Sequence, residues 1–221
     1  MKKTILLIIL LSNLLISYNL PNNFEYVKKL IPNIEIDIRY YTNNNFIGKP
    51  IDGYKSNLAI LTLPAIKALI NIQNELNTDG LGLKIFDAYR PQQAVNHFVK
   101  WSRDINNIKN KKQYYPSINK KNLFKKGYIA KKSSHSRGST VDLTIIHLQT
   151  KKELDMGGVF DLFSKISWLN SKNITKQQRK NRFLLHKIML KHGFKAYYKE
   201  WWHFSLKNEP YPKTYFNFNV F

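Results

Sequence analysis

The segment SSHSRGSTVDLTI, residues 133–145, joins a loop of small polar residues to a predicted strand. Val141, Leu143 and Ile145 alternate with polar residues, which is the two-residue period of a β-strand. Asp142 therefore projects from the strand face opposite to these apolar side chains. A carboxylate in such a stretch is costly to bury without a partner. The segment predicts a strand whose aspartate needs a cation or a metal ion.

His135 precedes Asp142 by seven residues, and Gly138 lets the loop between them turn back on itself. His203 lies far along the chain, in a second predicted strand. Two imidazoles and one carboxylate form a ligand set that zinc accepts, with a position left for water. A salt bridge between Asp142 and Arg137 would explain the aspartate without any metal. The residues alone leave both interpretations open.

Two further residues could take part in chemistry at such a site. Glu200 precedes His203 in EWWH and could act as a general base beside a metal-bound water. Residues three apart on a regular strand face opposite sides, so the strand must bulge or end between them. Arg90, in DAYRP, follows a predicted strand and could stabilise an oxyanion. The alternatives are an exposed Glu200 and a local pairing of Arg90 with Asp87.

The remaining pattern predicts strands and helices in irregular order. We expect strands near residues 34–38, 81–89, 141–148, 194–198 and 201–206. We expect helices over 63–77, capped by Thr62, over 91–102, and from Thr175 to His192, with a helical turn near 160–168. Residues 104–132 are predicted to be an irregular, basic, exposed insertion. This order favours an α+β fold with a small, mostly antiparallel sheet flanked by helices, in a single domain.

The N-terminal sequence MKKTILLIILLSNLLISYN combines two lysines with an apolar run. The run is shorter than the roughly 20 residues of a membrane span. It predicts a signal peptide over residues 1–17, or alternatively an uncleaved N-terminal anchor. We therefore expect residues 18–221 to form one exported domain, in the periplasm or cell envelope, touching a membrane only through an uncleaved N-terminus.

The formal net charge of +22 would attract anionic partners. One hypothesis from this charge is a non-catalytic module that binds the cell wall or nucleic acid. Nucleic-acid binding needs basic residues clustered with aromatic residues on one face, whereas these lysines are spread along the chain. We therefore expect no nucleic-acid partner. The absence of cysteine excludes disulfides and thiol nucleophiles.

Four motifs together resemble one family: SSHSRGSTVDLTI, DAYRPQQAV, MGGVFD at residues 156–161, and EWWHF. They are similar to the zinc D-alanyl-D-alanine dipeptidases, which are related to the enzymes of vancomycin resistance and to D,D-carboxypeptidases. The resemblance covers roughly residues 24–213. It implies a hedgehog-like or D-Ala-D-Ala-metallopeptidase-like fold and a zinc dipeptidase catalytic domain over residues 18–221. It also implies one zinc ion per chain, bound by His135, Asp142 and His203.

The resemblance further implies a role for each matching residue. Glu200 would be the general base and later the general acid, and Arg90 would stabilise the transition state. Asp161 would bind the substrate ammonium group, and Ser133 would contact the substrate. The implied reaction is hydrolysis of D-alanyl-D-alanine to two D-alanines. A D,D- or L,D-carboxypeptidase that trims peptidoglycan stem peptides would use the same residues, so the sequence leaves the choice between the dipeptide and a peptidoglycan-derived peptide open.

Overall fold

The computed structural model describes residues 19–221, so the predicted signal peptide lies outside the described residues. The strands are β1 (Phe24–Tyr26), β2 (Glu35–Ile36), β3 (Ile60–Thr62), β4 (Leu81–Asp87), β5 (Thr140–His147), β6 (Phe194–Ala196) and β7 (His203–Leu206). The α-helices are α1 (Val27–Leu30), α2 (Leu63–Asn77), α3 (Gln92–Arg103), α4 (Lys111–Tyr114) and α5 (Lys176–Lys191). None of the helices within residues 19–221 has the length and apolar character needed to span a bilayer.

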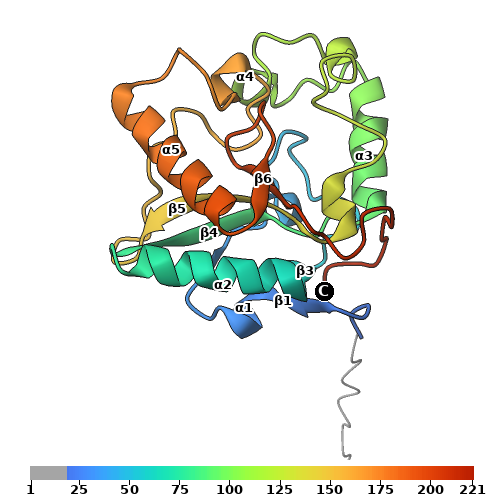
Figure 1. Ribbon diagram of the computed structural model, residues 1–221. Helices are drawn as coiled ribbons and strands as arrows, with labels where there is room; N and C mark the ends of the chain where they lie inside the picture. The colour runs from blue at the N-terminus through green and yellow to red at the C-terminus, as the bar shows by residue number, and fades with distance from the viewer. Residues whose placement is uncertain (1–18) are drawn as a thin grey trace, which may run out of the picture.

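The larger sheet has five strands in the order β2-β4-β5-β7-β6, and β1 pairs with β3 in a separate two-stranded sheet. Every neighbouring pair is antiparallel except β2 with β4. Helix α2 packs against β4 and α5 packs against β6, so that β4 and β5 lie between the two helices in Figure 1. This arrangement confirms the predicted α+β single domain with a small, mostly antiparallel sheet flanked by helices.

Strand β5 is the middle strand of the larger sheet, and both of its faces are covered. Its apolar residues Val141, Leu143 and Ile145 are fully buried, as the alternation predicts. Asp142, on the other face, is only 2 % exposed. The register pairs Asp142 with Asp87 of β4 on one side and with His203 of β7 on the other. The fold therefore brings polar residues from three strands together at one end of the sheet.

The predicted helix boundaries hold, but one predicted cap is wrong. Thr175 and Gln178 form a reciprocal capping box at the start of α5. Thr62 precedes α2, yet its hydroxyl makes no capping hydrogen bond. Because Thr62 also ends the buried strand β3, its hydroxyl is bonded instead to that of Ser139, at 2.7 Å.

Residues 104–132 differ from the prediction of an exposed, irregular insertion. The segment contains α4 and a 3₁₀ turn, Lys120–Asn122, and it buries the side chains of Tyr115 and Leu123. The Lys120 ammonium group is also buried, and it donates hydrogen bonds to the carbonyls of Asp104 and Asn107. The aromatic and apolar residues scattered through this basic stretch are therefore part of the core. Most of its other lysines remain exposed, as expected.

Other expected elements are shorter in the structure than in the sequence pattern. The strands expected at 34–38 and 194–198 reduce to β2 and β6, and the turn expected at 160–168 reduces to a 3₁₀ turn, Lys165–Ser167. The pairing of β2 ends early because the amide of Ile38 donates to the Asn57 side chain rather than to a neighbouring strand.

Gly138 provides a test of the turn that leads into β5. It has a left-handed φ of +82°, and an added Cβ would fall within the ring of Phe24. We expect Gly138→Ala to lower the free energy of unfolding by about 2–5 kcal/mol, through left-handed strain of ~1–2 kcal/mol and overpacking of ~1–3 kcal/mol. Urea-induced unfolding would measure this loss.

Gly80→Ala is the matched control for this change. Gly80 also has a left-handed φ, of +68°, but nothing lies within 4 Å of its added Cβ. The control should therefore lose only the strain contribution of about 1–2 kcal/mol. Equal losses in the two variants would show that the contact with Phe24 does not constrain the turn.

Candidate active site

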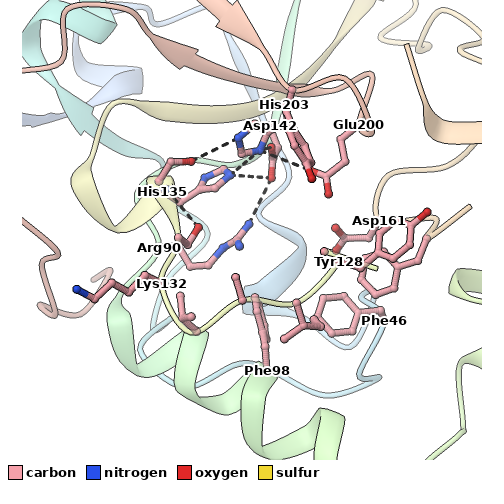
Figure 2. A pocket seen from close by; sticks show the side chains of 18 of the residues that line it. Phe46, Arg90, Phe98, Tyr128, Lys132, His135, Asp142, Asp161, Glu200 and His203 are labelled. Atoms are coloured by element: carbon pink, nitrogen blue, oxygen red, sulfur yellow. Dashed lines mark hydrogen bonds and ion pairs between the residues drawn. The ribbon is translucent and has the colours of Figure 1, made fainter. Parts of the chain in front are cut away.

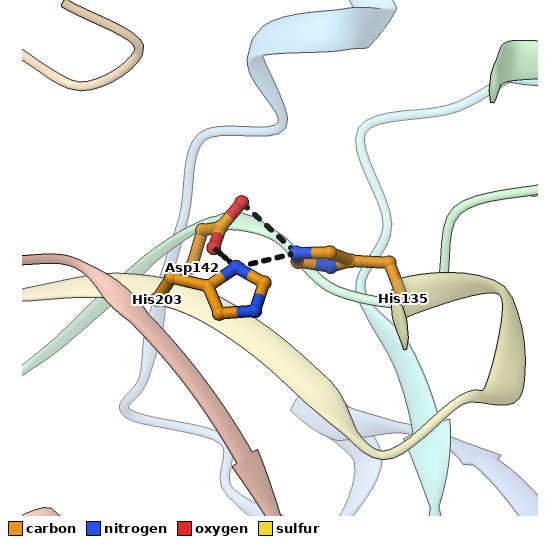
Figure 3. A group of neighbouring side chains, drawn as sticks. All are labelled: His135, Asp142 and His203. Atoms are coloured by element: carbon orange, nitrogen blue, oxygen red, sulfur yellow. Dashed lines mark hydrogen bonds and ion pairs between the residues drawn. The ribbon is translucent and has the colours of Figure 1, made fainter. Parts of the chain in front are cut away.

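His135, Asp142 and His203 converge at one end of the larger sheet (Figure 3). His135 lies on a 3₁₀ turn, Ser134–Arg137, immediately before β5, and His203 is the first residue of β7. Nε2 of His135 lies 3.2 Å from Nδ1 of His203 and 3.2 Å from Oδ2 of Asp142. Nδ1 of His203 lies 3.0 Å from Oδ1 of Asp142.

The three side chains have the chemistry and spacing of a metal site. With zinc–ligand bonds of about 2.1 Å, the ligand atoms of a tetrahedral site lie about 3.4 Å apart, close to the observed separations. Nδ1 of His135 bonds to the Ala88 carbonyl at 2.7 Å. Because that carbonyl only accepts, Nδ1 carries the proton and Nε2 of the neutral ring presents its lone pair to Asp142. Nε2 of His135 and the carboxylate of Asp142 are then both acceptors, so a cation can bind between them.

The cluster also fixes the charge of its own carboxylate. Burial alone would raise the pKa of Asp142, but His135 and His203 beside it hold that pKa well below its usual range. Burial lowers the pKa of His135, which favours the neutral imidazole that a metal requires. These two pKa shifts favour the ionised carboxylate and the neutral imidazole, which are the forms that bind a metal ion.

Arg90 reaches this cluster from the loop after β4. Its Nε donates to Oδ2 of Asp87 at 2.8 Å, which confirms the local pairing considered from the sequence. Its Nη2 lies 3.4 Å from Oδ2 of Asp142, so the same guanidinium also faces the metal-type site. The alternative pairing of Asp142 with Arg137 is wrong, because Arg137 makes two hydrogen bonds to Glu209 instead, at 2.7 and 2.8 Å.

Tyr54 and Asp87 support the site in a way that the sequence analysis missed. Asp87 is fully buried, and burial raises the pKa of its carboxyl group, against the opposing effects of Arg90 and His135. Its Oδ1 accepts a hydrogen bond of 2.6 Å from the Tyr54 hydroxyl, and its Oδ2 lies 3.5 Å from Nδ1 of His135. The position of Asp87 close to Arg90 in the sequence could have indicated its supporting role. Tyr54 lies in a distant loop, and no sequence pattern indicated its contact with Asp87.

Glu200 lies in the turn before β7, beside the histidines. Its backbone amide donates to the Tyr197 carbonyl, and its own carbonyl accepts from the His203 amide. Strand β7 therefore begins only at His203. Because Glu200 lies outside the regular strand, Glu200 and His203 can face the same site. Oε2 of Glu200 lies 3.6 Å from Nδ1 of His203. Burial raises the pKa of Glu200 to about 7.

A pocket of about 280 Å³ joins these residues (Figure 2). His135, Asp142, Glu200, His203 and Arg90 occupy one side of it. Its other walls are largely aromatic and come from elements far apart in the sequence: Tyr40, Phe46, Phe98, Tyr128, Phe163 and Tyr197. Ser133 also lines the pocket, and its hydroxyl accepts a weak hydrogen bond of 3.3 Å from the His135 amide.

Asp161 lies apart from the histidine cluster, on another side of the pocket (Figure 2). It accepts a hydrogen bond of 2.8 Å from the Tyr40 hydroxyl, and within residues 19–221 no basic side chain forms an ion pair with it. Burial raises the pKa of Asp161 well above its usual range, and the charge of Asp142 adds to this effect. Its backbone is left-handed, with φ of +63°. Asp161 is thus a buried acid that faces the pocket without a cation of its own.

A single α+β domain that gathers a His-Asp-His cluster and a buried glutamate in one pocket has the architecture of a metallopeptidase. The chain belongs to the D-ala-D-ala dipeptidase family of peptidases, whose sequence model matches residues 21–221. This confirms the family resemblance predicted from the four motifs.

Three curated relatives align with this chain over nearly their whole length. The chain is 43% identical to a D-alanyl-D-alanine dipeptidase of Enterococcus faecalis, over 90% of this chain and 98% of the relative. It is 41% identical to the Streptomyces coelicolor protein of the same name, over 90% and 98% of the two chains. It is 40% identical to the Enterococcus faecium protein of that name, over 89% of this chain and 98% of the relative.

The uncompensated burial of Asp161 gives a stability prediction. A carboxyl group whose pKa is raised by folding destabilises the folded state increasingly as pH rises above its unfolded pKa, because the folded state then holds a proton that the unfolded state has lost. We expect Asp161→Asn to stabilise the protein by about 1–3 kcal/mol at pH 8, with a smaller gain at pH 5. Urea unfolding at both pH values, in the presence of a chelator, would measure this gain.

The left-handed backbone does not confound this comparison, because asparagine tolerates that conformation as well as aspartate does. A variant no more stable than the parent at pH 8, or a gain that does not depend on pH, would contradict the prediction.

Proposed function

We propose that the chain is a zinc-dependent dipeptidase that hydrolyses D-alanyl-D-alanine to two D-alanines. The observation that carries the proposal is the His135–Asp142–His203 cluster beside Glu200, in a pocket of about 280 Å³. The names of the relatives support the choice of substrate. We also propose that the chain is exported, a proposal that rests on the sequence of residues 1–17 alone.

Nε2 of His135, Nδ1 of His203 and the Asp142 carboxylate would hold the zinc ion. When bound, zinc would lower the pKa of a water molecule and polarise the peptide carbonyl. Glu200 lies beside these ligands and would take the proton from the attacking water on its carboxylate. It would then give that proton to the leaving amine. Its raised pKa of about 7 suits a group that must both accept and release a proton near neutral pH.

Arg90 would stabilise the negative charge that develops on the carbonyl oxygen. Its Nε is held by Asp87, which fixes the guanidinium and leaves its Nη end facing the cluster. Asp161, supported by Tyr40, would bind the substrate ammonium group, since its carboxylate has no cationic partner. Ser133 would contact the substrate from the loop before His135.

A panel of dipeptides tests the proposal directly. D-Ala-D-Ala, D-Ala-L-Ala and L-Ala-L-Ala would be incubated with the protein before and after chelation, and then after addition of zinc. We expect the D,D-dipeptide to be hydrolysed fastest, activity to disappear on chelation, and zinc to restore it. Equal hydrolysis of all three, or activity indifferent to chelation, would refute the proposal.

Two kinds of variant should separate metal binding from proton transfer. We expect His135→Ala and His203→Ala to lose stoichiometric zinc. Glu200→Gln should keep zinc and lose about 10²–10⁴-fold in kcat, the range for removing a general acid–base group. Elemental analysis and steady-state kinetics would measure the two effects. His147→Ala, an exposed position at the other end of β5, is the matched control and should retain both.

A further inference from the structure

Arg182, on the second turn of α5, is a buried cation that takes no part in the proposed mechanism. Its side chain is only 2 % exposed. Burial lowers the pKa of its guanidinium to about 10, so the group is still charged at neutral pH. Within residues 19–221 no carboxylate forms an ion pair with it. Because a buried charge without a counter-ion is costly, its hydrogen bonds must account for its place in the core.

The guanidinium of Arg182 joins the two ends of one loop, residues 156–168. Its Nε donates to the Met156 carbonyl at 2.6 Å, and its Nη1 donates to the carbonyls of Ile166 and Trp168, both at 2.9 Å. Hydrogen bonds from a charged donor are roughly twice as strong as those between neutral groups. The loop that is closed in this way carries Asp161 to the wall of the active-site pocket.

A second contact extends this support to the neighbour of Asp161. Ser167 lies between the two residues whose carbonyls Nη1 binds, and its hydroxyl donates to the Leu162 carbonyl at 2.6 Å. Ser167 is fully buried, and Leu162 follows Asp161 directly in the chain. Arg182 is therefore connected to the backbone of Asp161 through two successive sets of hydrogen bonds.

Asp161 needs such support because its position in the pocket is unfavourable. Within residues 19–221 its buried carboxyl group has no ion-pair partner, and its backbone has a left-handed φ of +63°. Both features cost free energy and persist only where the surrounding structure holds them. The Tyr40 hydroxyl holds the carboxyl group itself, whereas Arg182 and Ser167 hold the backbone that carries it. Without them, the carboxyl group would turn towards water.

Arg182 also has a neighbour on the side of Glu200. The ring of Trp201, the residue after Glu200, lies 5.9 Å from the guanidinium, at the outer limit of a cation–π contact. An effect on Glu200 would pass through this weak contact, whereas three charge-assisted hydrogen bonds hold the loop of Asp161. The geometry therefore favours an effect on Asp161.

We infer that Arg182 is a positioning residue, which holds Asp161 where the substrate ammonium group binds and thereby sets the affinity for the dipeptide. The inference rests on the proposed function, because that function assigns the ammonium group to Asp161. It adds a residue of α5 to a site whose pocket is lined by residues from other elements.

The Arg182→Lys variant tests this role by kinetics. Lysine keeps the charge but lacks the planar fork that joins the two ends of the loop. For D-Ala-D-Ala and the zinc-loaded protein, we expect KM to rise about tenfold and kcat to change less than about twofold, because binding of the ammonium group is lost. Arg179→Lys changes an exposed arginine on the same helix and should leave both constants unchanged. A lower kcat with an unchanged KM would place the effect on Glu200 and would overturn the inference.

The Asp161→Asn background distinguishes positioning from a general loss of structure. If Arg182 acts through Asp161, Arg182→Lys should lower kcat/KM about tenfold in the parent protein and less than about twofold in Asp161→Asn, since the carboxylate that it places is already gone. Equal factors in the two backgrounds would assign Arg182 a structural role alone, against the inference.

The Ser167→Ala variant decides the question if Arg182→Lys does not fold. It removes only the hydroxyl that donates to the Leu162 carbonyl, further along the same connection to Asp161. We expect KM to rise about threefold with kcat unchanged, which is the effect of one neutral hydrogen bond on the loop. In that case a raised KM supports the inference, and an unchanged KM refutes it.

A stability measurement separates this inference from the proposed function. Asp161→Asn should stabilise the parent protein at pH 8, but in the Arg182→Lys background, or in Ser167→Ala if the former does not fold, this gain should fall to less than about half, because the released carboxyl group already reaches water. If the zinc-loaded protein does not hydrolyse the dipeptide, the proposed function fails, and the smaller gain still supports the positioning of Asp161 by Arg182. An equal gain in both backgrounds contradicts that positioning, whether or not the dipeptide is hydrolysed.

Discussion

The structure depends on one buried carboxylate in the middle of the sheet. Asp142 is 2 % exposed on β5, and the register places a second buried carboxylate, Asp87, directly beside it on β4. Two neighbouring buried anions repel each other strongly unless cations or hydrogen-bond donors compensate them. Arg90 contacts both carboxylates. The Tyr54 hydroxyl also donates to Asp87, and Nδ1 of His203 lies 3.0 Å from Oδ1 of Asp142. The residues that compensate this pair are also the residues that build the candidate active site.

The sheet register fixes the geometry of these groups. A shift of one residue would turn Asp142 into the apolar side and Val141 towards the histidines, since successive side chains alternate between faces. Strand β7 begins at His203, which pairs with Asp142. Because Glu200 lies in the turn before this strand, its side chain can face the same site as His203. The closeness of Asp142 and His203 is thus a consequence of strand pairing, whereas the 3₁₀ turn before β5 places His135 beside them.

Local patterns indicated the strands and the candidate residues, the family resemblance implied their roles, and long-range contacts account for what both missed. The alternation around Asp142 and the three-residue spacing of Glu200 and His203 are properties of neighbouring residues, so the sequence alone indicated both. The partners of Tyr54 and Arg137 lie 33 and 72 residues away along the chain. Their contacts arise only after the sheet and loops pack. The same reason explains why residues 104–132 were predicted to be exposed. Their apolar side chains are buried by contacts with distant parts of the chain, which local composition does not indicate.

The distribution of charge sets the active-site pocket apart from the rest of the molecule. In a chain with a net charge of +22, four of the fourteen acidic residues, Asp87, Asp142, Asp161 and Glu200, surround the active site and face a single buried guanidinium. A divalent ion beside Asp142 would offset part of this excess, but Asp161 lies on another side of the pocket and still lacks a cation. The ammonium group of a substrate would supply that cation, whereas a substrate carboxylate would be attracted to Arg90 rather than to Asp161.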